Sequence, residues 1–124
     1  MSNIRQQVLL TLVKGEEMYL PQLYRIFSEQ FPEVMKHYKQ LGTTCRSSGP
    51  LEEKTQDLVK LGIAIGNNSR GAVMSHTRKA LEAGATKEEI YHVVILALTT
   101  VGFPKMMAAM AWVQEVLNKW EDKQ

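Results

Sequence analysis

The strongest constraint on the fold of this chain is a helical reversal between Asp57 and His76. The segment reads DLVKLGIAIGNNSRGAVMSH, and its Asn-Asn-Ser sequence favours a turn followed by a helix N-cap. Asp57 lies ten residues before Asn67, and His76 lies nine residues after it. At about 1.5 Å per helical residue, both are roughly 14 Å from the turn. An antiparallel helix pair therefore brings the acid and the histidine to the same height.

The residues around His76 place its side chain on the inner face of a helix. One stripe with the i, i+3, i+4, i+7, i+8 spacing of a buried face comprises Val73, His76, Thr77, Ala80 and Leu81. Asp57 also faces apolar neighbours, four and seven residues further on. Buried polar groups are usually hydrogen-bonded, so one interpretation of His76 is a satisfied core histidine. The acid at matching height supports the other interpretation, an acid–base pair.

The whole chain predicts an all-α fold, because no segment alternates β-branched and polar residues over a strand's length. We expect a compact helical bundle of about six or seven helices. The expected helices cover residues 2–17, 21–30, 32–41, 50–65, 69–83 and 86–102, with a last one starting at residue 104. Thr86 and Glu89 form a capping box, and residues 43–49 are expected to be a loop. We interpret residues 1–124 as one domain, with 1–49 as a helical lead-in and 50–120 as the compact core.

The composition argues against several classes of partner. The net charge is +2, and basic residues are scattered among acidic ones, so we expect no nucleic-acid partner. No apolar run has the length of a membrane span, and the N-terminal segment lacks a small-residue cleavage site. We therefore expect a cytoplasmic protein without a membrane partner.

The cysteine and histidine content limits redox and metal chemistry. Cys45 is the only cysteine, which excludes an intramolecular disulfide and a Cys-x-x-Cys centre. His37 and His92 do not form a metal-binding set with His76, because their spacing offers no convergent ligands. We expect neither a metal nor a cofactor. A redox role for Cys45 would need an external partner, and Arg46 beside it is the one hint of an activated thiol.

The last helix predicts self-association. Its apolar seam follows alternating spacings of four and three and comprises Met106, Met110, Val113, Leu117 and Trp120. A second apolar edge runs through Met107, Ala111 and Val116. A small helical protein with apolar residues on more than one helix face often buries the remainder between subunits. We expect a homo-oligomer, although ordinary core packing accounts for at least half of this surface.

From Leu51 to about Leu117 the chain resembles the carboxymuconolactone decarboxylase family, which includes the alkylhydroperoxidase D-like proteins. The residues that carry the resemblance are Lys54-Thr55, Ala80, Gly84-Ala85-Thr86, Glu88-Glu89-Ile90 and Gly102-Phe103-Pro104, in this order. The resemblance implies the alkylhydroperoxidase D-like helical fold. It also implies a trimer or a hexamer, and we expect a hexamer built from three dimers.

The chain departs from the peroxidase branch of this family at three positions, since its acid is shortened from glutamate to aspartate and both cysteines are absent. That branch has an acid, two cysteines three residues apart and a histidine four residues further on. The corresponding residues are Asp57, Ser69, Ala72 and His76. A thiol peroxidase needs a thiolate nucleophile and a resolving thiol, and neither is present here. An alkylhydroperoxidase or peroxiredoxin-type activity is therefore the least favoured function.

The decarboxylase branch also lacks the cysteines, so its chemistry stays open to this chain. The resemblance implies His-assisted decarboxylation, or related acid–base chemistry, of a small carboxylated lactone. His76 is the expected proton donor, with an ordinary pKa of about 6.5, and Asp57 would orient and charge its ring. Ser69, Arg70 and Thr100 are candidates for substrate binding. The alternative is a non-catalytic oligomeric family member or small-molecule binder that has kept the fold without the chemistry.

Overall fold

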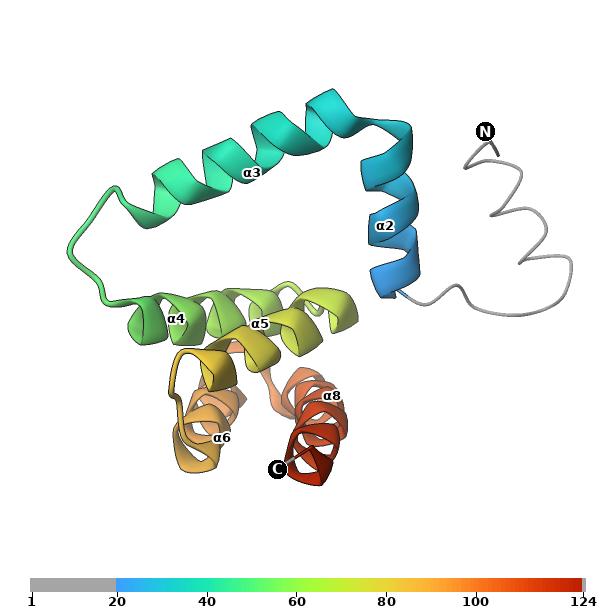
Figure 1. The fold of residues 1–124 in the computed structure, drawn as a ribbon. Helices are drawn as coiled ribbons and strands as arrows, with labels where there is room; N and C mark the ends of the chain where they lie inside the picture. The colour runs from blue at the N-terminus through green and yellow to red at the C-terminus, as the bar shows by residue number, and fades with distance from the viewer. Residues whose placement is uncertain (1–19, 124) are drawn as a thin grey trace, which may run out of the picture. The chain divides into compact units, whose positions relative to one another are not determined.

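The computed structural model describes residues 20–123, which form helices joined by short loops (Figure 1). No strand occurs in this described range, and the all-α prediction is confirmed. The helix predicted for residues 2–17 lies outside the described residues. The chain divides into two compact units, Met1–Gly49 and Pro50–Gln124, at the boundary expected between the lead-in and the core. That the whole chain is one domain stays a prediction.

The described part of the first unit consists of α2 (Leu20–Gln30) and α3 (Pro32–Arg46), which pack against each other. Proline in the first turn favours the start of α3. The predicted loop at 43–49 is wrong for its first four residues, because α3 continues through Gly42 to Arg46. Two threonine hydroxyls in this stretch donate to the carbonyls four residues earlier, which lets the helix accommodate them.

The second unit is a bundle of α4 (Glu53–Gly66), α5 (Arg70–Glu82), α6 (Lys87–Leu96), α7 (Leu98–Val101) and α8 (Phe103–Asp122). The helices α4 and α5 lie side by side, and α6 and α8 pack against them (Figure 1). The four long helices share one apolar core. Its fully buried large side chains include Leu61, Ile65, Val73, Ile90, Val94, Val113 and Leu117.

The predicted reversal between α4 and α5 is confirmed. Asn67 ends α4, and Asn68 adopts the left-handed conformation that asparagine tolerates, with φ 52°. Ser69 is the N-cap of α5, and its hydroxyl accepts a hydrogen bond from the Ala72 N–H at 3.4 Å. This short turn fixes α5 antiparallel to α4, which is the arrangement that the Asp57–His76 argument requires.

The predicted helix over residues 86–102 is wrong as one continuous element, because the chain breaks at Ala97 into α6 and the short α7. The Ala97 N–H donates to the Val94 carbonyl, a tighter three-residue hydrogen bond at 3.1 Å. Gly102 then ends α7 with φ 96°, a conformation that glycine adopts without strain. Pro104 follows in the first turn of α8, as predicted.

The apolar seam of α8 packs within its own chain. Met106, Val113 and Leu117 are buried, and Met110 and Trp120 are partly buried against the same core. Val116, assigned to the second apolar edge, is also buried, whereas Met107 is exposed. Most of the seam is therefore accounted for by the core of its own unit, and self-association stays a prediction.

Truncating the core side of α8 should destabilise the bundle. Leu117→Ala should lower the free energy of unfolding by about 2–5 kcal/mol, because it removes buried methyl groups and leaves a cavity. Met107→Ala, on the exposed side of the same helix, should change it by less than about 0.5 kcal/mol. Chemical denaturation followed by tryptophan fluorescence measures both values. Equal effects of the two substitutions would contradict the assigned orientation of α8.

Candidate functional site

Asp57 is the most unusual polar residue of the second unit, because it is a carboxylate inside the helical core. It lies on α4 with 2% of its surface exposed, four residues before the fully buried Leu61. Burying an ionised carboxylate costs free energy unless other groups of the protein interact with it. Asp57 does interact with another group of the chain. Its position therefore satisfies the expectation of an inward-facing acid on this helix.

His76 lies on α5, the helix that packs directly against α4. Its side chain is half-buried, its Nδ1 atom is buried, and it also interacts with another group of the chain. The neighbouring Thr77 is fully buried, and its hydroxyl donates to the Val73 carbonyl at 2.7 Å. The histidine is thus on the inner side of α5, as its spacing predicted. Direct contact between His76 and Asp57 stays a prediction from their register.

Each of the three candidate substrate-binding residues has a structural partner in the chain. Ser69 caps α5, as described above. The Nη2 of Arg70 lies 3.0 Å from the Oε2 of Glu115, an ion pair between α5 and α8 with both side chains about half exposed. The exposed Thr100 hydroxyl donates to the Leu96 carbonyl at 3.2 Å. Their substrate-binding roles stay predictions.

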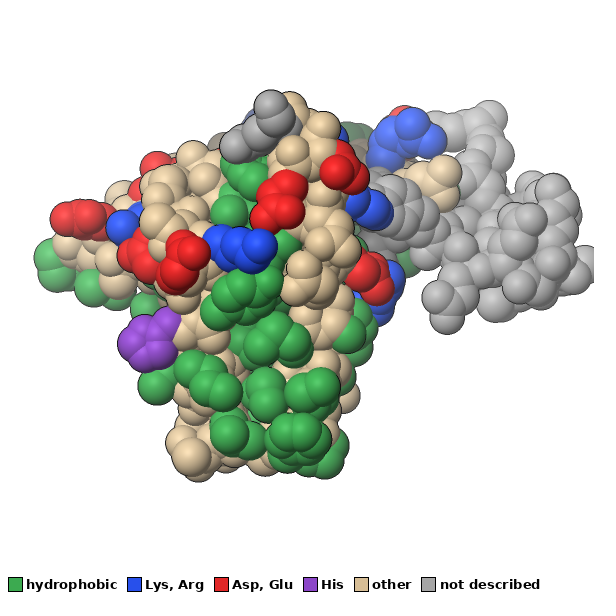
Figure 2. Space-filling view, turned by 90° about the horizontal axis from the view of Figure 1, so that it is seen from below, with side chains coloured by type: hydrophobic (Ala, Val, Ile, Leu, Met, Phe, Trp, Pro, Cys, Tyr) green, Lys and Arg blue, Asp and Glu red, His purple; other side chains and the backbone are tan. Residues whose placement is uncertain are grey.

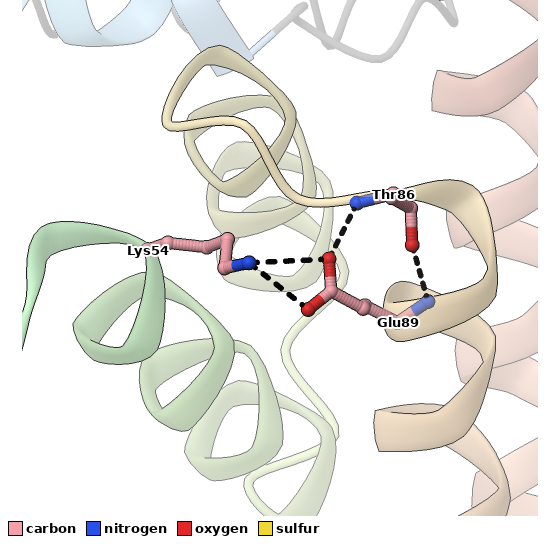
Figure 3. Close-up of polar contacts among 3 residues, drawn as sticks. All are labelled: Lys54, Thr86 and Glu89. Carbon is pink, nitrogen blue, oxygen red and sulfur yellow. Dashed lines mark hydrogen bonds and ion pairs between the residues drawn. The ribbon is translucent and has the colours of Figure 1, made fainter.

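An ion pair that the sequence interpretation missed ties α4 to the start of α6 (Figure 3). The Nζ of Lys54 lies 3.1 Å from the Oε2 of Glu89, and the side chains are 37% exposed. The Oε1 of Glu89 accepts the Thr86 N–H at 2.9 Å, and the Thr86 hydroxyl accepts the Glu89 N–H at 3.1 Å. The capping box is confirmed as predicted. The ion pair was not predicted, and the sequence feature that could have indicated it is that Lys54 and Glu89 both belong to the family-like pattern.

This network lowers the pKa of Glu89 from its ordinary value of 4.5. The largest cause is the hydrogen bond from the Thr86 backbone N–H, followed by the hydrogen bond from Lys54. Both donors favour the charged carboxylate, whereas partial desolvation opposes them. Lys54, Thr86 and Glu89 therefore have a structural role, because they hold α6 beside α4.

The described residues contain no metal-binding constellation. No group of three or more His, Cys, Asp or Glu side chains converges among them. Cys45 is exposed on α3, in the other unit from His76 and Asp57. Between residues 20 and 123, no helix is long and apolar enough to cross a bilayer.

Comparisons with known proteins agree with this architecture. The sequence pattern of the carboxymuconolactone decarboxylase family matches residues 32–115, so the match begins at α3 rather than at Leu51. A solved apo structure of a carboxymuconolactone decarboxylase family protein from Legionella pneumophila superposes with a TM-score of 0.66. The similarity covers 93% of this chain and 92% of that one at 22% identity, which establishes a common fold.

Two curated relatives are similar in sequence. An uncharacterised protein of Methanocaldococcus jannaschii is 30% identical over 95 residues, covering 76% of this chain and 91% of that protein. A nitrosuccinic acid decarboxylase of Metarhizium robertsii is 34% identical over 82 residues, covering 66% of this chain. The match spans 57% of the length of that decarboxylase, so little more than half of it corresponds to this chain.

The Lys54–Glu89–Thr86 network should make stability depend on pH in the acidic range. Because the pKa of Glu89 is lowered on folding, its contribution is complete above the ordinary value of 4.5 and is lost as the pH falls below it. Glu89→Gln should therefore destabilise the protein at pH 7, and the difference from wild type should shrink towards pH 3. Urea denaturation across this range measures the effect, with the exposed Glu82→Gln as control. A difference that does not vary with pH would exclude this role of Glu89.

Proposed function

The chain belongs to the carboxymuconolactone decarboxylase family, and we propose from this that it decarboxylates a small carboxylated molecule with His76 as proton donor. The observation that carries the proposal is the pair of inward-facing groups on two packed antiparallel helices. Asp57 is buried on α4, and the Nδ1 of His76 is buried on α5. An ionisable ring with a second group that orients it is suited to act as a general acid.

The reaction needs one proton at a defined place. When the bond between the substrate carbon and its carboxylate breaks, carbon dioxide leaves and the electron pair stays on the carbon as an enolate-like carbanion. A protonated His76 would stabilise this negative charge and then transfer its proton to the carbon. Asp57 would favour the charged form of the ring before the reaction. The ring then takes up a proton from water to complete the cycle.

The low-polarity surroundings favour such a role. His76 is flanked on α5 by Val73 and Ala80, which are fully buried, and Asp57 has Leu61 one turn away. Electrostatic interactions are stronger in a medium of low dielectric constant than in water. A charged imidazole at the edge of this core would act strongly on a carbanion beside it. The nitrosuccinic acid decarboxylase supports decarboxylation as the reaction class, and the family supports a lactone acid as substrate.

One observation favours the alternative of a non-catalytic family member or small-molecule binder. Ser69, Arg70 and Thr100 are engaged in an N-cap, an ion pair and a backbone hydrogen bond. All three interactions lie within the chain, and each accounts for its residue without a bound substrate. A peroxidase function has less support than either, because Ser69 and Ala72 stand where the thiols would be.

Substituting His76 or Asp57 should lower the rate of turnover. We expect His76→Gln to lower kcat for carbon dioxide release at least about 100-fold, the usual contribution of a general acid. Asp57→Asn should lower it less, because the ring remains. The exposed His92→Gln is the matched control and should leave the rate unchanged. The substrates to test are small carboxylated lactones and nitrosuccinic acid. Turnover in wild type that persists in His76→Gln would refute the assignment of the proton donor.

NMR titration tests the pairing of the two residues without a substrate. A carboxylate beside the ring favours the imidazolium, so Asp57→Asn should lower the pKa of the His76 ring. His92 provides an internal reference in the same spectra and should titrate alike in both proteins. Identical titration of His76 in wild type and Asp57→Asn would show that Asp57 is not its partner, and His76 would then be a structural core residue.

A further inference from the structure

The N-terminal end of α4 lacks a side-chain cap. Its N-cap residue, Glu52, makes no side-chain hydrogen bond to the first turn. Residues 47–53 are exposed, and the second unit begins among them at Pro50. The side-chain amide of Gln56 donates to the Leu51 carbonyl at 2.8 Å, but this hydrogen bond lies within the same segment. Because the first N–H groups of a helix have no acceptor within it, local opening of α4 is expected to start at this end.

Asp57 lies close to this end of α4. It is the first buried residue of the helix, and the fully buried Leu61 follows one turn later. The residues of the first turn, 53–56, are exposed or half-buried. Packing in the core therefore secures α4 from Leu61 onward, whereas the turn before Asp57 lies outside this packing. Opening of that turn would displace the acid from the height of His76.

Lys54 connects this first turn to another helix. Its Nζ lies 3.1 Å from the Oε2 and 3.5 Å from the Oε1 of Glu89 on α6 (Figure 3). Glu89 is itself held in place, because its Oε1 accepts the Thr86 N–H and the next residue, Ile90, is fully buried. Residues three apart on a helix are neighbours on its surface, and Lys54 lies three residues before Asp57. The ion pair thus ties the turn before Asp57 to a well-packed part of α6.

We propose that Lys54 and Glu89 are positioning residues for the acid–base pair, because their ion pair holds the start of α4 where Asp57 lies level with His76. The inference rests on the proposed function, in which Asp57 orients and charges the His76 ring. Lys54 makes no contact with the substrate in this role. Loss of the ion pair should therefore lower the rate of proton transfer and leave substrate binding unchanged.

A second ion pair with one member in the first turn of α6 provides a matched comparison. The Nζ of Lys87 lies 2.9 Å from the Oε1 of Glu121, with the side chains 43% and 57% exposed. Acidic and basic side chains lie beside one another on the surface shown in Figure 2, and exposed ion pairs of this kind add little to overall stability. Loss of either pair should leave the protein folded. The Lys87 pair joins α6 to α8, and neither helix carries a member of the acid–base pair.

A double substitution that keeps the net charge tests the positioning role. Lys54→Met with Glu89→Gln removes one charge of each sign, and the new side-chain carbonyl can still accept the Thr86 N–H. NMR titration should show the pKa of the His76 ring lowered by at least about half of the decrease that Asp57→Asn causes. Lys54→Met alone removes a positive charge, whose direct electrostatic effect would be a rise in this pKa. A decrease in both variants therefore reports displacement of Asp57.

The matched control, Lys87→Met with Glu121→Gln, should leave the pKa of the His76 ring unchanged. An unchanged pKa in the double variant of the first pair, while Asp57→Asn lowers it, would overturn the positioning role and retain the acid–base pair. Without any effect of Asp57→Asn, the acid–base pairing is wrong and the positioning role falls with it. Because the titration needs no substrate, it decides the positioning role separately from turnover.

Hydrogen exchange and kinetics distinguish positioning from a general loss of stability. The backbone amides of residues 56–58 should exchange at least about tenfold faster in the double variant of Lys54 and Glu89, and at the wild-type rate in the control. We expect kcat to fall about tenfold while KM changes by less than about twofold. Lys54→Arg should keep the wild-type values, because a guanidinium also pairs with a carboxylate. A raised KM with unchanged kcat would assign Lys54 to substrate binding and overturn the positioning role.

Discussion

The packing of α4 against α5 is the interaction on which the rest of the second unit depends. It buries Leu61 and Ile65 of one helix with Val73 of the other, and α6 and α8 complete the same core. The turn at Asn68 makes this packing antiparallel without any long connection. Because Asp57 belongs to the buried side of α4, the core and the candidate site are formed by the same contact. A change that loosens the helix pair would therefore affect both stability and chemistry.

The family-like residues divide into two groups with different physical roles. Lys54, Thr86 and Glu89 form a helix cap and an ion pair that hold α6 beside α4. These contacts give the three residues a role in the fold. Asp57 is buried on α4, where a carboxylate costs free energy unless other groups of the protein interact with it. Both Asp57 and His76 have such interactions within the chain. Family membership thus establishes the fold directly, whereas the chemistry depends on two side chains whose contact has to be tested.

Local signals explain which parts of the fold could be predicted from the sequence. The caps at Ser69 and Thr86 depend on residues near in sequence, and the structure has them as predicted. The extension of α3 beyond Gly42 was missed because one glycine weakens a helix by only about 1 kcal/mol and so does not have to end it. The break at Ala97 carries no proline or glycine at the site itself.

Long-range partners were harder to predict, since spacing shows that a face is apolar but not what covers it. The α8 seam that begins at Met106 has the spacing of a subunit contact, yet it packs against the core of its own unit. The α3 face formed by Val34, Tyr38 and Leu41 has the same kind of spacing and stays exposed. The difference lies in the neighbours of each helix. The α8 seam lies against a four-helix core, whereas the described part of the first unit has two helices and one buried residue. Periodicity alone therefore does not distinguish a helix stripe that packs into a core from one that stays exposed.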